Sequence, residues 1–236
     1  MKKLLSLIRA AVDKYNMIDE GDRIAIGVSG GKDSVALLCA MARLKSFYPK
    51  NFDIVAVTLD YRFYNEDEDY SKIQELCDSL GVQYVIKPTE LWQVIFETRK
   101  EENPCSLCAK MRRGILHDTA KELGCNKIAL GHHLDDAAET FMMNLTNGGR
   151  IGCFSPVSYL SRKDLYLIRP MVFAYEKDVI KAVNSFDLPI VKSKCPADGV
   201  TNRQNTKELL CSLEKTYPGL RQKIVGALQR GNIDNW

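Results

Sequence analysis

One six-residue stretch, Ser29–Ser34 (SGGKDS), constrains the fold of this chain more than any other. It follows an apolar run at 23–28 that predicts a buried strand, and it leads into residues 33–44, whose apolar spacing predicts a helix. Two adjacent glycines let the backbone turn tightly and point its amides inward, and the start of a helix adds partial positive charge. The stretch therefore predicts a strand, a turn and a helix that together hold a phosphate group. It differs from the G-x-x-x-x-G-K-[ST] loop, because Asp33 follows Lys32.

The same alternation of short apolar strands and helices recurs along the chain. Further strands are expected at 54–59, 83–86 and 127–130, and further helices at 4–15, 70–80, 106–123, 135–145, 176–186, 203–216 and 220–229. This order predicts an α/β fold with a doubly wound parallel sheet and a short C-terminal helical extension. Ligands of such folds bind at the carboxyl ends of the strands, where the Gly-rich turn is expected to lie.

Length and composition limit the remaining possibilities. The chain has 236 residues, of which 45% are hydrophobic and 27% charged, an ordinary composition for a globular protein with a substantial core. No apolar run approaches the roughly 18 residues that span a bilayer, and residues 1–18 lack the pattern of a secretory signal. We therefore expect a cytoplasmic protein that does not associate with membranes. The net charge of +3 is too small to indicate nucleic-acid binding by itself.

A second polar stretch, Gly131–Thr140 (GHHLDDAAET), follows the fourth expected strand. Asp135 and Asp136 begin a helix, where the dipole favours carboxylates and where they can serve as caps. Capping needs only one of them, and a carboxylate pair beside a triphosphate can hold Mg²⁺, which prefers oxygen ligands. His132 and His133 are neighbours at a strand end and point in opposite directions, so we expect a packing or loop role for at least one.

Eight cysteines in a chain with no export signal are expected to stay reduced. Cys105 and Cys108 form a C-x-x-C pair at the start of the helix expected at 106–123. Thiols at a helix N-terminus have lowered pKa values, and a pair at this spacing can bind a metal or act in redox chemistry. A second C-x-x-C, which a four-cysteine zinc site needs, is missing from the sequence. The spacing by itself leaves the metal and redox roles open.

Both polar stretches match the signatures of one enzyme family. Ser29–Ser34 resembles the PP-loop of the ATP-pyrophosphatases, which adenylate a substrate oxygen and release pyrophosphate, and Gly131–Thr140 resembles the signature of their tRNA-modifying branch. The cysteine pair and the following AKMRRG are similar to the tRNA 2-thiocytidine synthetases of that branch. In that family a third cysteine completes the ligands of an iron–sulfur cluster. Cys195 stands at the matching place, and Cys153 is the next candidate.

The resemblance implies an ATP-dependent tRNA sulfurtransferase that uses Mg²⁺ and a 4Fe-4S cluster. ATP would adenylate a pyrimidine, cytidine 32 of the anticodon loop by resemblance, and cluster-bound sulfur would replace its oxygen. The implied cluster ligands are Cys105, Cys108 and Cys195. The implied catalytic residues are Asp33, Arg112, Asp135 and Asp136. The residues expected to contact ATP are Gly27, Ser29, Gly30, Gly31, Lys32, Asp33, Ser34, Thr58, Asp60 and Gly131.

Three other functions stay open at this point. A uridine tRNA thiolase of the same superfamily is disfavoured, because the zinc-binding cysteine pairs expected at both ends of that branch are missing. A tRNA-Ile lysidine synthetase shares both nucleotide motifs but needs no cluster, so the three cysteines argue against it. A nucleotide-binding module without turnover is disfavoured by the intact acidic residues of the two motifs.

The chain is expected to divide into an N-terminal helix (1–22), a PP-loop catalytic domain (23–190) and a helical extension (191–236) that carries the third cysteine. Basic residues exceed acidic ones only within 161–236, so the tRNA backbone is expected there. The residues expected to contact it are Arg203, Lys207, Arg221 and Lys223. Because few residues remain for RNA, we expect a homodimer. The sulfur donor implied is a cysteine desulfurase or sulfide.

Overall fold

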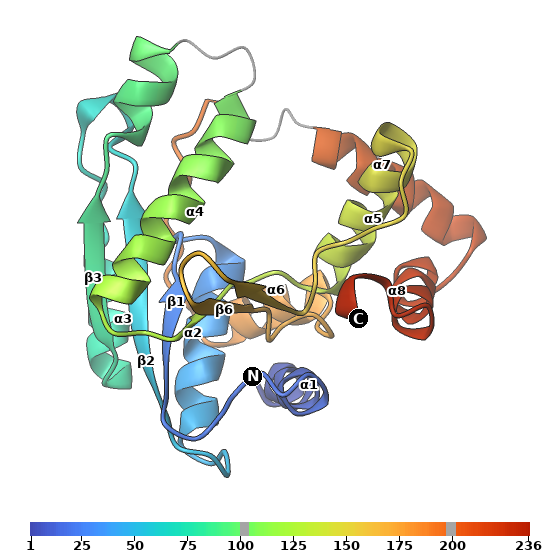
Figure 1. The fold of residues 1–236 in the computed structure, drawn as a ribbon, viewed down its shortest axis with the longest axis horizontal. Coiled ribbons are helices and arrows are strands. Elements are labelled where there is room, and N and C mark those ends of the chain that lie inside the picture. The colour runs from blue at the N-terminus through green and yellow to red at the C-terminus, as the bar shows by residue number, and fades with distance from the viewer. Residues whose placement is uncertain (100–103, 197–201) are drawn as a thin grey trace.

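The computed structural model describes residues 1–99, 104–196 and 202–236. A six-stranded sheet with the order β3-β2-β1-β4-β6-β5 forms its centre, and helices cover both faces (Figure 1). The strands are β1 (Asp22–Gly27), β2 (Phe52–Asp60), β3 (Gln83–Pro88), β4 (Lys127–Ala129), β5 (Val157–Leu160) and β6 (Leu165–Ile168). The α-helices are α1 (Lys2–Lys14), α2 (Lys32–Lys45), α3 (Ser71–Leu80), α4 (Pro104–Glu122), α5 (Leu134–Gly148), α6 (Glu176–Ser185), α7 (Asn202–Thr216) and α8 (Leu220–Arg230). Short helical segments are η1 (Phe63–Asn65), η2 (Gln93–Thr98) and η3 (Ile233–Asn235).

The sheet is parallel except at one edge. β1 pairs in parallel with β2 and with β4, β2 pairs in parallel with β3, and β4 pairs in parallel with β6. β5 pairs with β6 in the antiparallel direction. The predicted α/β fold is therefore confirmed, with an antiparallel edge strand added. Two further strands, β5 and β6, were not expected from the sequence; they form a four-residue hairpin pair at this edge.

Each face of the sheet has its own apolar core. The larger cluster includes Ile8 of α1, Leu37 of α2, Ile73 of α3 and Val179 of α6. The smaller cluster includes Ala120 of α4, Val57 of β2 and Ile128 of β4. Along β1, Ile26 belongs to the larger cluster and its neighbour Ala25 to the smaller one, as the alternation of side chains along a strand requires. Strands buried on both faces explain the continuous apolar runs of the sequence.

The last two helices pack on α5 and make a third cluster. Ala138 of α5, Leu210 of α7 and Ile224 of α8 form its buried centre. Figure 1 shows these three helices gathered on one side of the sheet. The helix that begins inside the second polar stretch is thus supported by the C-terminal helices. The described ranges contain no helix that is long and apolar enough to cross a membrane.

We predict that α1 is part of the main core and stabilises it. Ile8 is fully buried in the larger cluster, so Ile8→Ala should lower the free energy of unfolding by about 2–5 kcal/mol in urea titrations. Ser6→Ala, at an exposed position of the same helix, should change it by less than about 0.5 kcal/mol. Small and equal changes in the free energy of unfolding for both substitutions would show that α1 lies outside the main core. The division of the chain into 1–22, 23–190 and 191–236 stays a prediction.

Candidate active site

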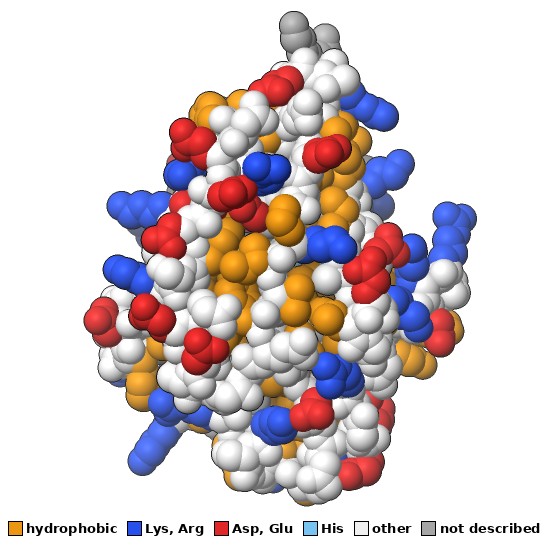
Figure 2. Space-filling view, turned by 90° about the vertical axis from the view of Figure 1, so that its left-hand side faces the viewer, with side chains coloured by type: hydrophobic (Ala, Val, Ile, Leu, Met, Phe, Trp, Pro, Cys, Tyr) orange, Lys and Arg blue, Asp and Glu red, His pale blue; other side chains and the backbone are white. Residues whose placement is uncertain are grey.

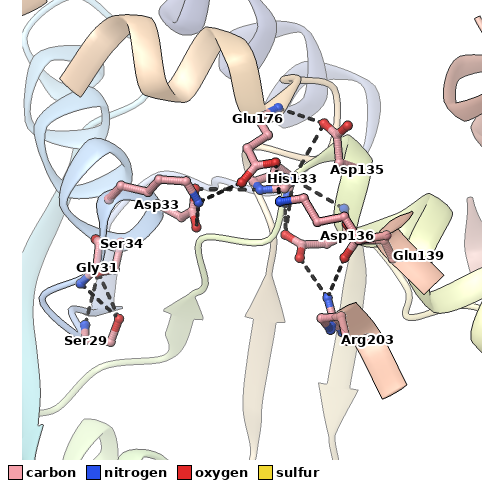
Figure 3. Close-up of polar contacts among 12 residues, drawn as sticks. Ser29, Gly31, Asp33, Ser34, His133, Asp135, Asp136, Glu139, Glu176 and Arg203 are labelled. Carbon is pink, nitrogen blue, oxygen red and sulfur yellow. Dashed lines mark hydrogen bonds and ion pairs between the residues drawn. The ribbon is translucent and has the colours of Figure 1, made fainter. Parts of the chain in front are cut away.

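The Gly-rich turn joins the carboxyl end of β1 to the first residue of α2, and its serines hold its shape (Figure 3). The Ser34 hydroxyl donates to the Gly31 carbonyl at 2.9 Å and accepts from the Ser29 backbone N–H at 3.1 Å. Gly30 has φ +84°, a conformation that favours glycine. The N-cap of α2 is Gly31, and no side chain among the described residues caps this helix. The first amides of α2 therefore remain available to an anion.

The second polar stretch lies directly against this turn. β4 ends beside β1, and the backbone of Gly131 after it approaches Asp33 so closely that a Cβ atom there would lie 3.0 Å from the Asp33 carbonyl carbon. It would also lie 3.2 Å from the Ser34 nitrogen. His133 Nε2 lies 3.6 Å from Asp33 Oδ1. The predicted approach of the two stretches at the carboxyl edge of the sheet is confirmed by the β1–β4 pairing.

Asp135 and Asp136 cap two different helices. Asp136 accepts from the His133 backbone N–H at 2.9 Å, and His133 Nδ1 accepts from the Asp136 N–H at 3.3 Å, which makes a capping box at the start of α5. Asp135 accepts from the first amide of α6 at 2.7 Å. Each also meets an arginine: Arg203 Nη1 lies 2.8 Å from Asp136, and Arg221 Nε lies 3.1 Å from Asp135. A magnesium ion on either carboxylate would have to replace that arginine, and this ligand role stays a prediction.

Asp33 keeps one oxygen without a hydrogen bond. Its Oδ2 accepts from Lys32 Nζ at 2.9 Å, whereas its Oδ1 is buried, lies 3.6 Å from His133 Nε2 and has no hydrogen bond within the described ranges. A buried oxygen in this state is costly unless a cation or donor reaches it. Asp33 Oδ1 therefore fits a bound cation at the turn better than either of the paired carboxylates of α5.

Glu176, the first residue of α6, joins the turn to the C-terminal helices. Its carboxylate lies 3.1 Å from Lys32 Nζ and 2.7 Å from Lys207 Nζ. Burial acts to raise the pKa of Glu176, but hydrogen bonds from Lys207 and Lys32 lower it to about 2. Burial likewise acts to lower the pKa of Lys32, yet Asp33 and Glu176 raise it above its usual value. Lys32 is thus held as a cation beside the turn. The sequence carried no local signal for Glu176, because its role depends on residues distant along the chain.

The basic residues expected on the tRNA backbone mostly belong to this network. Lys207 pairs with Glu176, and Arg203 pairs with Asp136 and Glu139. The side chain of Arg221 is only 11% exposed and pairs with Asp135 and Glu214, and its contact with RNA stays a prediction. These cations compensate the acids of the second polar stretch, which are too buried to stay unpaired.

The residues expected near adenine make hydrogen bonds and packing contacts within the protein at the ends of the strands. Thr58 is fully buried, and its hydroxyl donates to the Val28 carbonyl at 2.7 Å and accepts from Tyr84 at 2.8 Å. Asp60 accepts from two backbone amides of the following loop, at 3.0 and 3.3 Å. A Cβ atom on Gly27 would lie 3.2 Å from the Leu130 side chain. Direct contact of Gly27, Thr58 and Asp60 with a nucleotide stays a prediction.

The three cysteines predicted as cluster ligands lie on two segments, α4 and the stretch after α6, and the second of these contacts the turn. The Val191 N–H donates to the Gly30 carbonyl at 3.0 Å, so the segment that leads to Cys195 runs along the turn. Burial raises the pKa of Cys108, Arg112 acts to lower it, and Cys195 and Cys105 add to the rise. All three thiols are thus within electrostatic range, and thiols are the donors that iron–sulfur clusters prefer. Within 1–99, 104–196 and 202–236, no three such side chains are close enough to hold a metal ion. The ligand set stays a prediction.

Cys153 and Arg112 occupy very different surroundings. The Cys153 thiol packs against the main core and donates to the Ala137 carbonyl at 3.4 Å, and burial raises its pKa to about 12. These properties favour a structural role over the alternative ligand role. Arg112 is exposed on α4 and interacts with Cys108 and with the Tyr61 hydroxyl. Its guanidinium is available to a ligand at the thiols.

Known proteins resemble this chain in sequence and in fold. Residues 3–203 match the PP-loop domain family. The tRNA-cytidine(32) 2-sulfurtransferase of Aliivibrio fischeri (strain MJ11) is 37% identical over 97% of this chain and 74% of its own length. The enzymes of that name from Geobacter sulfurreducens and Dichelobacter nodosus are 35% and 39% identical, over 98% and 97% of this chain and 90% and 86% of their own lengths.

One solved structure shares the whole architecture. The U34-tRNA thiolase NcsA from Methanococcus maripaludis, solved with its [4Fe-4S] cluster, superimposes with a TM-score of 0.77. The superposition covers 95% of this chain and 77% of that one, at 24% sequence identity. This likeness establishes the common fold.

We predict that Gly131 sets the position of the phosphate turn. Because the added methyl group would press on the backbone of Asp33 and Ser34, Gly131→Ala should weaken ATP binding by on the order of 10- to 100-fold in calorimetric titrations. Gly114→Ala provides the matched control, since Gly114 lies within α4 and a Cβ atom there meets nothing within 4 Å. Unchanged ATP affinity in Gly131→Ala would contradict this role.

We also predict a pH-dependent contribution of Glu176 to stability. Its folded-state pKa of about 2 lies below the usual 4.5, so its carboxylate stabilises the fold fully above about pH 4.5 and loses this effect as the pH falls towards 2. Glu176→Gln should therefore lower the free energy of unfolding at pH 7 by on the order of 1–3 kcal/mol, and the difference should shrink below pH 4.5. Urea titrations across this range, with exposed Glu75→Gln as control, measure it. A pH-independent difference would contradict the assignment.

Proposed function

The chain belongs to the PP-loop domain family, in the group of the tRNA-cytidine(32) 2-sulfurtransferases, and from this premise we propose that it uses ATP to replace a tRNA pyrimidine oxygen by sulfur. By the names of its relatives the target is cytidine 32. One observation carries the proposal. The segment that hydrogen-bonds to the phosphate turn at Gly30 continues to Cys195, which we assign to the cluster with Cys105 and Cys108. This contact supports a nucleotide site and a cluster site close to each other, as activation of a base and its thiolation require.

The phosphate turn is suited to hold the triphosphate of ATP. The free amides at the start of α2 point at the anion, the helix dipole favours it, and Lys32 supplies a fixed positive charge. When ATP binds, its phosphates compete with Asp33 and Glu176 for Lys32. Activation moves the AMP group to the base oxygen and releases pyrophosphate, and cations at the turn stabilise the charge that collects on this leaving group.

Asp33 is the residue best placed to hold Mg²⁺. Its Oδ1, which makes no hydrogen bond to the described residues, is a hard oxygen ligand at the turn, with Asp135 and Asp136 as further candidates once their arginines are displaced. When bound, the ion would supply positive charge that neutralises the leaving pyrophosphate.

The thiols would hold the iron–sulfur cluster. We assign Cys105, Cys108 and Cys195 as its ligands, and the cluster, when bound, would supply the iron that presents sulfide to the activated base. Arg112 favours the thiolate form of Cys108, and its exposed planar guanidinium fits the α-phosphate or a phosphate of the tRNA.

The remaining assignments concern partners and organisation. We propose that the sulfur comes from a cysteine desulfurase or from sulfide, and that the protein acts in the cytoplasm as a homodimer. The dimer is supported by the small share of the chain outside the α/β core, which leaves little surface for a tRNA. The catalytic part is assigned to 23–190 and the helical extension to 191–236.

We predict that Cys195→Ser separates the two halves of the reaction. The anaerobically purified variant should lose the broad visible absorption of the cluster and lose thiolation, while its affinity for ATP stays within about twofold, because Cys195 is outside the phosphate turn. Cys153→Ser should keep both the visible absorption of the cluster and thiolation, since Cys153 packs against the core. A Cys195→Ser protein that still thiolates tRNA, or a colourless wild-type protein with stoichiometric zinc, would contradict the cluster assignment.

The target base is identified by mass spectrometry of nucleosides from tRNA of a deletion strain. Loss of 2-thiocytidine, restored by the wild-type gene, is the expected result. Loss of a 2-thiouridine would indicate the uridine-modifying activity instead, and loss of lysidine would indicate the ligase. tRNA with unchanged nucleosides would contradict a role in modification.

A further inference from the structure

Five aromatic side chains gather at the carboxyl ends of β2 and β3. They are Tyr61, Phe63, Tyr64, Trp92 and Phe96. The Trp92 ring is central: its centroid lies 4.5 Å from that of Tyr64, 4.7 Å from that of Phe96 and 5.9 Å from that of Phe63. We call this group the aromatic platform. Because β1, β2 and β3 are parallel neighbours, the platform lies at the same edge of the sheet as the phosphate turn.

The aromatic platform reaches the surface at Tyr64, which is 54% exposed. Phe63, Trp92 and Phe96 are partly exposed, and Tyr61 packs against the smaller cluster. Figure 2 looks onto the side of the molecule that carries β3, where hydrophobic side chains form a band bordered by acidic and basic ones. Exposed aromatic groups of this size are typical of surfaces that bind a partner.

The backbone that presents Tyr64 is strained. Arg62, Tyr64 and Asn65 have φ values of +50°, +60° and +62°, which are unfavourable for residues with a Cβ atom. The Glu97 carboxylate accepts from Asn65 Nδ2 at 2.9 Å and from Trp92 Nε1 at 2.8 Å. These bonds tie the strained turn to η2 and use the polar edge of the indole. What the platform offers most directly to a partner is therefore the ring of Tyr64, the exposed member of the five.

Tyr61 connects the aromatic platform to α4. Its ring centroid lies 5.4 Å from that of Phe63. The helix α4, which carries Cys105, Cys108 and Arg112, contacts both β2 and η2. Arg112 and Arg113 are exposed on this end of α4. The aromatic rings therefore lie beside the helix that carries two of the predicted ligands and exposed cations.

We propose that the aromatic platform stacks unpaired bases of the tRNA anticodon loop beside the nucleotide that is modified, an inference that rests on the proposed function. Aromatic rings stack the faces of bases of any sequence, while exposed arginines bind the phosphates between them. A base must leave the stack of bases in the loop to reach the thiols. The rings of the platform can then stack the bases next to it. Paired RNA hides its base faces, so the platform selects loops over stems.

The test compares two RNAs with one set of variants. The probes are an anticodon stem-loop with an unmodified cytidine at position 32 and a duplex of the same stem without the loop. Tyr64→Ala should weaken binding of the stem-loop by about 5- to 100-fold, the range for one stacked base, and leave binding of the duplex unchanged. Tyr64→Phe keeps the ring and should restore affinity. The slope of log Kd against log salt should stay constant in both, because no phosphate contact is lost.

Tyr159→Ala is the matched control. Tyr159 is 53% exposed and pairs with Tyr166 at a centroid distance of 4.9 Å, but it lies on β5 at the opposite edge of the sheet. This substitution should leave the affinity for both RNAs unchanged. ATP affinity should also be unchanged in Tyr64→Ala, which verifies that the variant is folded.

Three results would overturn the proposal: unchanged stem-loop affinity in Tyr64→Ala, an equal loss for stem-loop and duplex, or weakened ATP binding, which would place the rings in the nucleotide site. Each of these three results differs from the result that would contradict the proposed function. If the wild-type protein thiolates tRNA while Tyr64→Ala thiolates the stem-loop equally well, the function stands and the platform does not. If the wild-type protein thiolates no tRNA, the function itself is wrong.

Discussion

The parallel pairing of β1 with β4 is the constraint on which the rest of this structure depends. It aligns the carboxyl ends of two strands whose following segments are about a hundred residues apart in sequence, and it presses Gly131 against the backbone of Asp33 and Ser34. With any side chain at Gly131, the start of α2 would have to shift. The phosphate turn, the capping box of α5 and the position of Asp33 all follow from this one contact.

Charge compensation ties the C-terminal helices to that contact. The second polar stretch brings several acids into a half-buried place, and burying unpaired carboxylates is costly. Arg203 of α7 pairs with Asp136, Arg221 of α8 pairs with Asp135, and Lys207 of α7 pairs with Glu176 of α6. The last third of the chain therefore neutralises the site as well as covering α5. The basic excess of this region is explained largely inside the protein. An incoming triphosphate meets a network of cations that is already ordered, which lowers the cost of binding it.

The chemistry proposed for this enzyme is arranged along consecutive strand ends. The phosphate turn follows β1, the aromatic platform begins after β2 and is completed after β3, and the segment beside Gly30 continues to Cys195. A tRNA loop on the platform would approach the thiols and the activated phosphate from one direction. A parallel sheet achieves this without long loops, because all its strand ends share one edge.

The sequence by itself determined the α/β fold, the phosphate turn, the meeting of the two polar stretches and the candidate thiols, because these depend on local periodicity and on glycines next to strands. It missed β5 and β6, the two strands of a hairpin, and it gave no sign that Arg221 pairs with Asp135, a residue far along the chain. Only the tertiary structure decided that Asp135 and Asp136 cap different helices, that Glu176 bridges Lys32 and Lys207, and that Trp92 joins rings from another loop. These contacts form between segments that are far apart in sequence. Packing fixes where two charges or two rings lie in space, so no local sequence pattern indicates them.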